Sequence, residues 1–414
     1  MHRTALLLVL ASACGDDGGV HTLKDAPTLD ASPGTATVTL RVGRQPVPNY
    51  TVYFQGPDSS EIATIQTDAN GQASAVVPDG SSVSTLDFEY YGNKASRSVV
   101  TIMGVKAGDH LAITGNVDFY LESADLDVTF APYTGVATPT YEVQTTCGGT
   151  RFGDVTQRSF GAPLCSPRID SMVMAVDSSN RNVAYIATLD QAIDAPLDLT
   201  SVAWTALTSS GSTYTSIPEA QYIEPSRRLV TPRGEIMRCS DGFQSGATTY
   251  TANLDCPMIP GVTMLDTLMY TDVELMWEVT QPVTTQASTI DVANTLIRGI
   301  ASTSFDGATR TISWTETASG ATPEFVTLHI EDRSHPNPNY WEIIAPYDGT
   351  SITLPALVGE AAELALDPTI QPSVVARTGT ATGGYDAIRR HGPFFERSIT
   401  DEISRIITVR PYVD

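Results

Sequence analysis

The stretch IATIQTDANGQASAVV, residues 62–77, decides the predicted fold class. Alternating segments flank its centre, and a period of two is typical of strands with one buried face. Asn70–Gly71 lies between the two segments. Asn-Gly is the strongest short signal of a β-hairpin, because both residues tolerate a positive φ. The stretch therefore predicts strands at 62–66 and 72–77, joined as a hairpin by the turn at 67–71.

The residues on either side of this stretch predict more strands of the same kind. Residues 37–42 alternate with period two, and Pro46 and Pro48 then interrupt the pattern. Pro78–Asp79–Gly80 marks a second turn. Further strands are predicted at 50–54, 83–90, 98–103 and 111–114. Residues 35–116 are therefore predicted to form one β-sandwich domain.

The order of these elements resembles a known family. The strands, Pro46–Val47–Pro48, the turn TDANG at 67–71 and Pro78–Asp79–Gly80 resemble the carboxypeptidase-regulatory-like (transthyretin-like) domains. They are similar also to invasin-type bacterial Ig-like domains. The resemblance implies a β-sandwich with a spacer or accessory role. Asp68 and Asn70 are alternative calcium ligands, but no further carboxylate follows at EF-hand spacing, which favours a turn.

Two more β-sandwich domains are predicted, at 117–285 and 286–414, because strand-length segments recur between turn residues there. In the second domain the strands are predicted at 126–130, 141–146, 171–176, 183–189, 200–206, 263–269 and 273–279. In the third they are predicted at 311–315, 325–330, 340–345, 351–354, 374–377 and 403–409. The chain as a whole is predicted to be an all-β protein of tandem β-sandwiches.

Some residues of these two domains predict local features. Trp204 and Trp277 fall inside predicted strands, where core packing is favoured over a platform for stacking carbohydrate. The segment around Trp314 resembles the start of a fibronectin-III-like domain. Residues 358–366 (VGEAAELAL) predict a helix of about two turns that Pro368 ends.

Residues 1–13 are typical of a bacterial signal peptide, with a short apolar run followed by small residues. The sequence Ala11–Ser12–Ala13–Cys14 resembles the lipobox of bacterial lipoproteins. The resemblance implies cleavage before Cys14 and lipidation of Cys14. Residues 14–34 then predict a flexible tether, because they are rich in Gly, Asp and Pro. The alternative is an ordinary secretory signal cut near Ala13, with Cys14 as a free thiol.

The cysteines support export to an oxidising compartment. The chain has five, and lipidation of Cys14 leaves the even set Cys147, Cys165, Cys239 and Cys256. Four cysteines allow three pairings. We favour Cys147–Cys165 and Cys239–Cys256, because each pair is close in sequence and closes a Gly-rich loop of similar size. A four-cysteine metal site is disfavoured, because no close Cys-x₂₋₄-Cys pair is present.

The strong negative charge limits the partners. The formal net charge is −23, from 24 basic and 47 acidic residues. Such a surface repels phosphate groups, so nucleic-acid binding is excluded and attachment to a membrane would rely on the lipid. Solubility is the simple interpretation of the charge, and collection of divalent cations is the alternative. No cofactor is predicted.

No catalytic motif is found. The sequence contains no Gly-x-Ser-x-Gly, His-Glu-x-x-His, Walker A or Gly-x-Gly-x-x-Gly pattern. In the segment HIEDRSH at 329–335, His329 and Glu331 share a face of a predicted strand and are alternative metal ligands, although a solvated strand end is favoured. The basic segment Arg389–Arg390–His391 is predicted to pair with nearby acids, with an anion site as the alternative.

These observations predict a non-catalytic lipoprotein of the bacterial cell envelope, in the outer rather than the inner membrane. Its sandwiches would present a surface to a glycan or an envelope protein. A hydrolase of glycans or peptides, with an accessory Ig-like domain and an active site within 117–414, is the alternative function. A purely structural spacer is the third.

Overall fold

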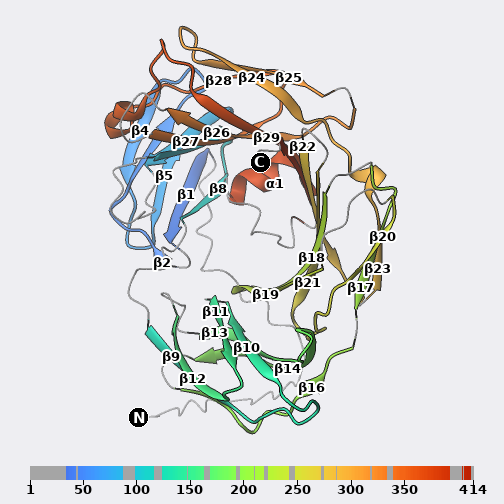
Figure 1. Cartoon of the computed structure of the whole chain (residues 1–414). Helices are drawn as coiled ribbons and strands as arrows, with labels where there is room; N and C mark the ends of the chain where they lie inside the picture. The colour runs from blue at the N-terminus through green and yellow to red at the C-terminus, as the bar shows by residue number, and fades with distance from the viewer. Residues whose placement is uncertain are drawn as a thin grey trace, which may run out of the picture.

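The computed structural model describes residues 34–42, 45–86, 98–115, 124–146, 148–162, 168–192, 196–208, 210–218, 222–241, 248–271, 275–285, 287–317, 319–332, 339–391, 403 and 405–411. The predicted signal peptide and Cys14 lie outside these residues. Within them, strands predominate over two 3-10 helices and one α-helix (Figure 1). The all-β prediction is therefore confirmed.

A twelve-stranded sheet, here called the long sheet, runs through the described structure. Its strands from one edge to the other are β19 (Gly234–Ser240), β18 (Tyr222–Thr231), β21 (Thr263–Thr271), β22 (Leu275–Val283), β30 (Ile406–Pro411), β29 (Ser373–Ala381), β26 (Phe325–Asp332), β27 (Asn339–Pro346), β7 (Ser98–Val105), β6 (Ser81–Leu86), β3 (Thr51–Gln55) and β4 (Glu61–Gln66). Strands of all three predicted domains therefore hydrogen-bond within one sheet. The boundaries predicted at 116/117 and 285/286 stay predictions.

Two strand pairs join the predicted domains. β27 pairs with β7 in parallel, with Ile343 opposite Thr101, which joins the third domain to the first. β22 pairs with β30 antiparallel, with Val279 opposite Ile407, which joins the second domain to the third. These contacts make the long sheet a single hydrogen-bonded layer across the described chain.

Three smaller sheets pack on the long sheet (Figure 1). The N-terminal sheet consists of β2 (Gln45–Pro46), β1 (Thr35–Val42), β5 (Gln72–Val76) and β8 (His110–Gly115). The disulfide sheet consists of β20 (Tyr250–Asn253), β17 (Gly211–Thr215) and β23 (Ala287–Asp291). The C-terminal sheet consists of β24 (Ile300–Asp306), β25 (Thr311–Glu316) and β28 (Ser351–Thr353).

Two more sheets pack on each other and form a separate sandwich core. One consists of β12 (Gln157–Ala162), β9 (Ala124–Phe130) and β15 (Leu197–Leu199). The other consists of β11 (Gly148–Gly153), β10 (Thr140–Thr145), β13 (Arg168–Val176), β14 (Asn182–Ala192) and β16 (Thr205–Ala206). The outer side of this second sheet buries Met172 and Met174 against Leu229 of β18, so the separate sandwich also contacts the long sheet.

The two faces of the long sheet pack on different layers. Val100 and Ile344 lie on one face, here called the front face, in a core with the N-terminal sheet. Val99 and Trp341 lie on the opposite, back face, in a core with the C-terminal sheet. Because both faces of β7 are buried, its sequence SVVTIMGV is apolar without alternation, as expected for a fully covered strand.

The hairpin predicted at 62–77 is wrong. β4 pairs with β3 in the long sheet, whereas β5 pairs with β1 in the N-terminal sheet. The connection at 67–71 therefore crosses from one layer of the sandwich to the other. Each strand still turns one side toward the shared core, to which Ala73 contributes from β5 and Ile62 and Ile65 from β4. The alternating pattern of residues 62–77 reflects the burial of one face of each strand. It does not specify which strands pair with each other.

The turn within this connection is present. The Gly71 N–H donates to the Asp68 carbonyl at 2.9 Å, and Gly71 has a φ of 72°. Asn70 is not among the residues with positive φ, so only the glycine uses the left-handed region. The Asp68 carboxylate accepts the N–H groups of Asn70 at 2.8 Å and Gln72 at 2.9 Å. These bonds confirm the turn predicted around Asp68.

Two predictions of local structure need correction. Trp204 precedes the two-residue strand β16 rather than lying within a strand, and its indole N–H donates to the Ala131 carbonyl at 2.8 Å. Its ring packs against Phe130, Tyr133 and Tyr141, which confirms core packing for this residue. The pattern missed α1 (Gly384–His391), because eight residues span too few turns for a clear period.

The helix predicted at 358–366 forms as a 3-10 helix, η2 (Gly359–Leu364). The other 3-10 helix, η1 (Val292–Thr295), follows β23. The segment that carries η2 is held against the first domain, where the Glu360 N–H donates to the Tyr53 hydroxyl at 3.2 Å. Gly359 has a φ of 57°, and a Cβ at this position would meet Tyr53 Cε1 at 2.6 Å.

Gly359→Ala is therefore expected to lower the free energy of unfolding by about 1–3 kcal/mol, through backbone strain and the clash with Tyr53. Gly108→Ala is the matched control, since Gly108 has a φ of 88° but no atom within 4 Å of a built Cβ. Urea unfolding followed by circular dichroism compares the two. Equal losses would show that the contact between Gly359 and Tyr53 contributes nothing.

Candidate functional site

The described cysteines form the second predicted disulfide. Cys239 in β19 is bonded to Cys256, which follows β20, with a Cα–Cα distance of 5.9 Å. The bond joins β19, an edge strand of the long sheet, to the chain segment that follows β20. Cys256 is fully buried. Cys147, Cys165 and Cys14 lie outside the described residues, so their predicted roles stay predictions.

An ion pair lies beside the disulfide in the core on the back face. Arg227 of β18 stands directly opposite Cys239 on one side and Asp266 of β21 on the other. The Arg227 Nε donates to Asp266 Oδ1 at 2.6 Å, and both side chains are completely buried. The hydroxyl of Ser288 donates to Asp266 Oδ2 at 2.9 Å, and Arg227 Nη2 donates to Ser212 Oγ at 2.8 Å. The pair therefore ties the long sheet to the disulfide sheet.

A second network ties the separate sandwich to the long sheet. The buried Asp170 of β13 accepts hydrogen bonds from the Thr231 hydroxyl at 2.6 Å and from Arg233 Nη1 at 2.9 Å. It also accepts the backbone N–H of Asp190 at 2.7 Å. Thr231 and Arg233 belong to the end of β18 and the turn before β19. The carboxylate is thus used to hold two sheets together.

In the basic segment at 389–391, the first residue, Arg389, pairs with acidic side chains as predicted. Arg389 of α1 donates from Nε to Asp109 Oδ2 at 2.8 Å and from Nη2 to Asp109 Oδ1 at 2.7 Å. It also forms an ion pair with Asp386, which in turn accepts a bond from Lys106 Nζ at 3.0 Å. Arg389 is nearly fully buried. Its guanidinium therefore attaches α1 to the N-terminal sheet, which argues against an anion site on this residue.

The middle of the front face carries charges that we call the front polar cluster. Its members come from five neighbouring strands and are Glu278, His329, Glu342, Arg377 and Arg410. Burial lowers the pKa of Arg377, and the charge of Arg410 lowers it further, while Glu278 and Glu342 oppose the shift. The cluster thus mixes both signs of charge on adjacent strands.

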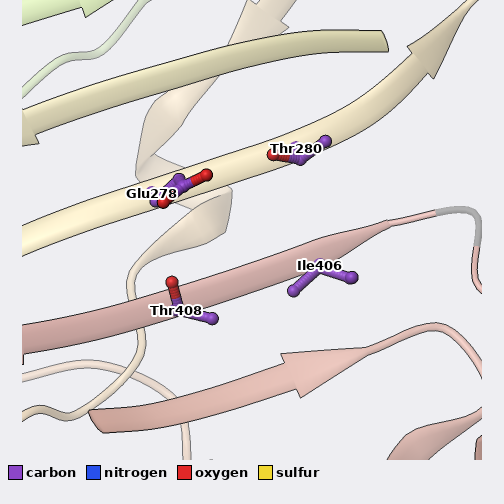
Figure 2. Close-up of a pocket in the computed structure, with 4 residues that line it drawn as sticks. All are labelled: Glu278, Thr280, Ile406 and Thr408. Atoms are coloured by element: carbon purple, nitrogen blue, oxygen red, sulfur yellow. The ribbon is translucent and has the colours of Figure 1, made fainter. Parts of the chain in front are cut away.

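A small pocket opens within this face (Figure 2). Glu278 and Thr280 of β22 and Ile406 and Thr408 of β30 line it. Its volume is about 10 Å³, which is about the space of one water molecule. Pockets for small molecules measure ~300–1,000 Å³, so this pocket is far too small for a substrate.

His329 is the histidine of the cluster, and it forms a hydrogen bond from Nδ1 to Glu342 of the neighbouring strand. His335 lies outside the described residues. Among the described residues, no group of three or more His, Cys, Asp or Glu side chains is placed to hold a metal ion. Among the residues that the structure describes, no hydroxyl or thiol is hydrogen-bonded to His329.

Comparison with protein-family models and with curated proteins finds no match. Among solved structures, a likeness is found to the TIE protein of Bacillus anthracis, with 12% sequence identity and a TM-score of 0.16. The likeness covers 63% of this chain and 50% of that one, so the chain spans half the length of this neighbour. Among the described helices, none is long and apolar enough to cross a membrane.

The residues that sequence analysis missed are Arg227 and Asp266. Asp266 lies in β21 at the position between Met264 and Leu268 on the same face of the strand, and all three side chains are buried. An acid within an apolar stripe is a signal for a buried pair. The sequence does not reveal its partner, because Arg227 is 39 residues away and on another strand.

The hydrogen bond to Glu342 raises the pKa of His329 above its usual 6.5, burial opposes this, and Glu331 adds to it. The protonated form of His329 is therefore favoured in the folded protein. Its contribution to the stability of the fold is fully present below about pH 6.5 and is lost as the pH rises through the raised pKa. In an NMR titration, Glu342→Gln should lower the His329 midpoint, and Glu331→Gln should lower it less. An unchanged midpoint in Glu342→Gln would contradict this account.

Proposed function

We propose that this chain is a lipid-anchored, non-catalytic protein of the bacterial cell envelope, whose joined β-sandwiches present a surface to a glycan or an envelope protein. The likeness to a lipobox at Cys14 supports the anchor, and residues 15–34 supply the tether. The disulfide between Cys239 and Cys256 supports an oxidising location, because such bonds are rare in the cytosol.

The proposal that the protein is non-catalytic rests on the pairing of its buried carboxylates with arginines. Asp170, Asp266 and Asp109 each bind an arginine and hold separate layers or elements together. A catalytic carboxylate must instead face a space that a substrate can enter. The pocket described at the front polar cluster, beside Glu278, has room for about one water molecule. The described charges therefore support a rigid scaffold better than an active site.

The anchor is tested by fractionating bacteria that express the full chain or its Cys14→Ala variant. The wild-type chain should sediment with membranes and partition into detergent, because several acyl chains bind bilayers stably. Cys14→Ala should shift to the soluble fraction, while a Cys165→Ala variant should stay with the membranes. Membrane association of Cys14→Ala without lipid would overturn the anchoring part.

The binding role is tested on glycan arrays and on separated envelope proteins, with turnover assays on polysaccharide and peptide substrates run in parallel. Binding without turnover is the expected result. Turnover would favour a hydrolase and overturn the proposal. Neither binding nor turnover would favour a structural spacer and would also overturn the proposed binding role.

A further inference from the structure

A cavity of about 120 Å³ lies on the back face, between the C-terminal sheet and the segment that carries η2. Its walls are apolar side chains from separate elements: Phe305 of β24, Trp341 of β27, and Leu354, Leu357 and Leu366 around η2. The charged residue among those that line it is Arg310, which ends the turn between β24 and β25. The cavity thus joins an apolar interior to one positive charge.

The walls of this cavity are fixed by contacts of their own. Trp341 is almost fully buried, and its indole N–H donates to the Thr101 hydroxyl at 2.8 Å. The N–H of the buried Leu354 donates to the Arg310 carbonyl at 2.8 Å. This bond fixes the backbone at Arg310 beside Leu354, which also lines the cavity. Gln55 of β3 donates to the Ala356 carbonyl and fixes the same segment from the other side. The site is therefore formed before any ligand binds.

Arg310 differs from the buried arginines described above. Arg227, Arg233 and Arg389 each bind a carboxylate, whereas the exposed Arg310 side chain has no ion pair or hydrogen bond with any residue that the structure describes. Its φ of 53° places it in the left-handed region, at the end of the turn. A guanidinium presents a fork of N–H donors that matches a carboxylate. The fork is thus available at the mouth of an apolar cavity.

We propose that this cavity binds a small amphipathic carboxylate, with its apolar group beside Trp341 and its carboxylate on Arg310. The size of the apolar group follows from the volume. A dry apolar cavity of about 150 Å³ accepts benzene, so 120 Å³ with an open mouth suits a ring or branched chain of four to six carbons. The net negative charge of the chain does not forbid the anion, because charges farther than ~8 Å are largely screened at physiological salt.

The test is a titration of the full chain with phenylacetate and with 2-phenylethanol, its neutral analogue of similar shape, followed by saturation-transfer NMR and tryptophan fluorescence. Phenylacetate should bind with a dissociation constant on the order of millimolar, as expected for so few atoms. It should bind about tenfold more tightly than 2-phenylethanol. Equal affinities would overturn the proposed role of the charge, and no binding of either would overturn the site.

Variants locate the ligand. Arg310→Gln should weaken phenylacetate about tenfold and leave 2-phenylethanol unchanged, while Arg310→Lys should recover part of the loss. Arg238→Gln is the matched control. Arg238 is exposed and does not line the cavity, so its substitution removes one positive charge elsewhere on the protein. Leu366→Trp should block both compounds by filling the cavity. If Arg238→Gln weakened phenylacetate as much as Arg310→Gln, the effect would be one of net charge and the assignment to Arg310 would fail.

Discussion

Asp266→Ala is expected to destabilise the protein by about 3–5 kcal/mol, because it leaves the fully buried Arg227 without its carboxylate. Ser288 would lose its acceptor at the same time, which weakens the link between the long sheet and the disulfide sheet. Urea unfolding measured by circular dichroism and tryptophan fluorescence gives the difference. The fluorescence of Trp277, which packs in the same core, reports on this region.

Two controls separate the buried pair from charge in general. Arg238→Gln removes a base that pairs with Glu235 on the surface, and this variant should lose less than about 1 kcal/mol of stability. The double variant Arg227→Met with Asp266→Leu should recover most of the stability, because a buried pair is replaced by apolar groups at little cost. A loss of less than about 1 kcal/mol in Asp266→Ala would contradict the described network.

Removing the disulfide with the double variant Cys239→Ala and Cys256→Ala is expected to cost about 3 kcal/mol. The two residues are 17 apart in sequence, and in the chain-entropy model a loop of this size restricts the unfolded chain by that amount. The bond also fixes the segment after β20 to β19, so proteolysis between 241 and 255 should become faster.

Thiol counting in the unfolded protein provides the control for this variant. The wild-type chain should show no free thiol, and the double variant should also show none if Cys147 and Cys165 are bonded as predicted. Two free thiols in the double variant would contradict that pairing. An unchanged free energy of unfolding would show that the Cys239–Cys256 bond does not limit the unfolded chain.

Local pattern predicted the strands of this protein better than their partners. β10, β13, β25, β26 and β27 all lie where alternating or apolar segments predicted them. Successive side chains of a strand point to opposite faces of the sheet, so a strand with one buried face has an apolar residue at every second position of its sequence. Pairing depends on contacts far apart in the chain, as between β7 and β27, and no local signal specifies those.

The turn at 67–71 shows the same limit in detail. Asp68 and Gly71 predicted a tight turn, and the hydrogen bonds of Asp68 confirm it. Whether the chain then returns beside β4 or crosses to β1 depends on which sheet covers the core. The registers of β3 with β4 and of β1 with β5 show that it crosses.

The candidate site was less predictable than the fold. Cys239–Cys256 was predicted because the two residues are close in sequence. The ion pair of Arg227 and Asp266 needed the registers of β18 and β21, which alternation alone does not give. The cavity beside Trp341 combines residues from three elements, and no motif joins them.

The lipid anchor is tested most directly by the mass of the N-terminal peptide of the mature protein isolated from bacterial membranes. A lipid-anchored protein should give a peptide that begins at Cys14 and carries acyl chains on that residue. Removal of the lipid should release the protein from the membrane. A peptide that begins elsewhere, or one with an unmodified thiol at Cys14, would contradict the lipid anchor and the cysteine assignment together.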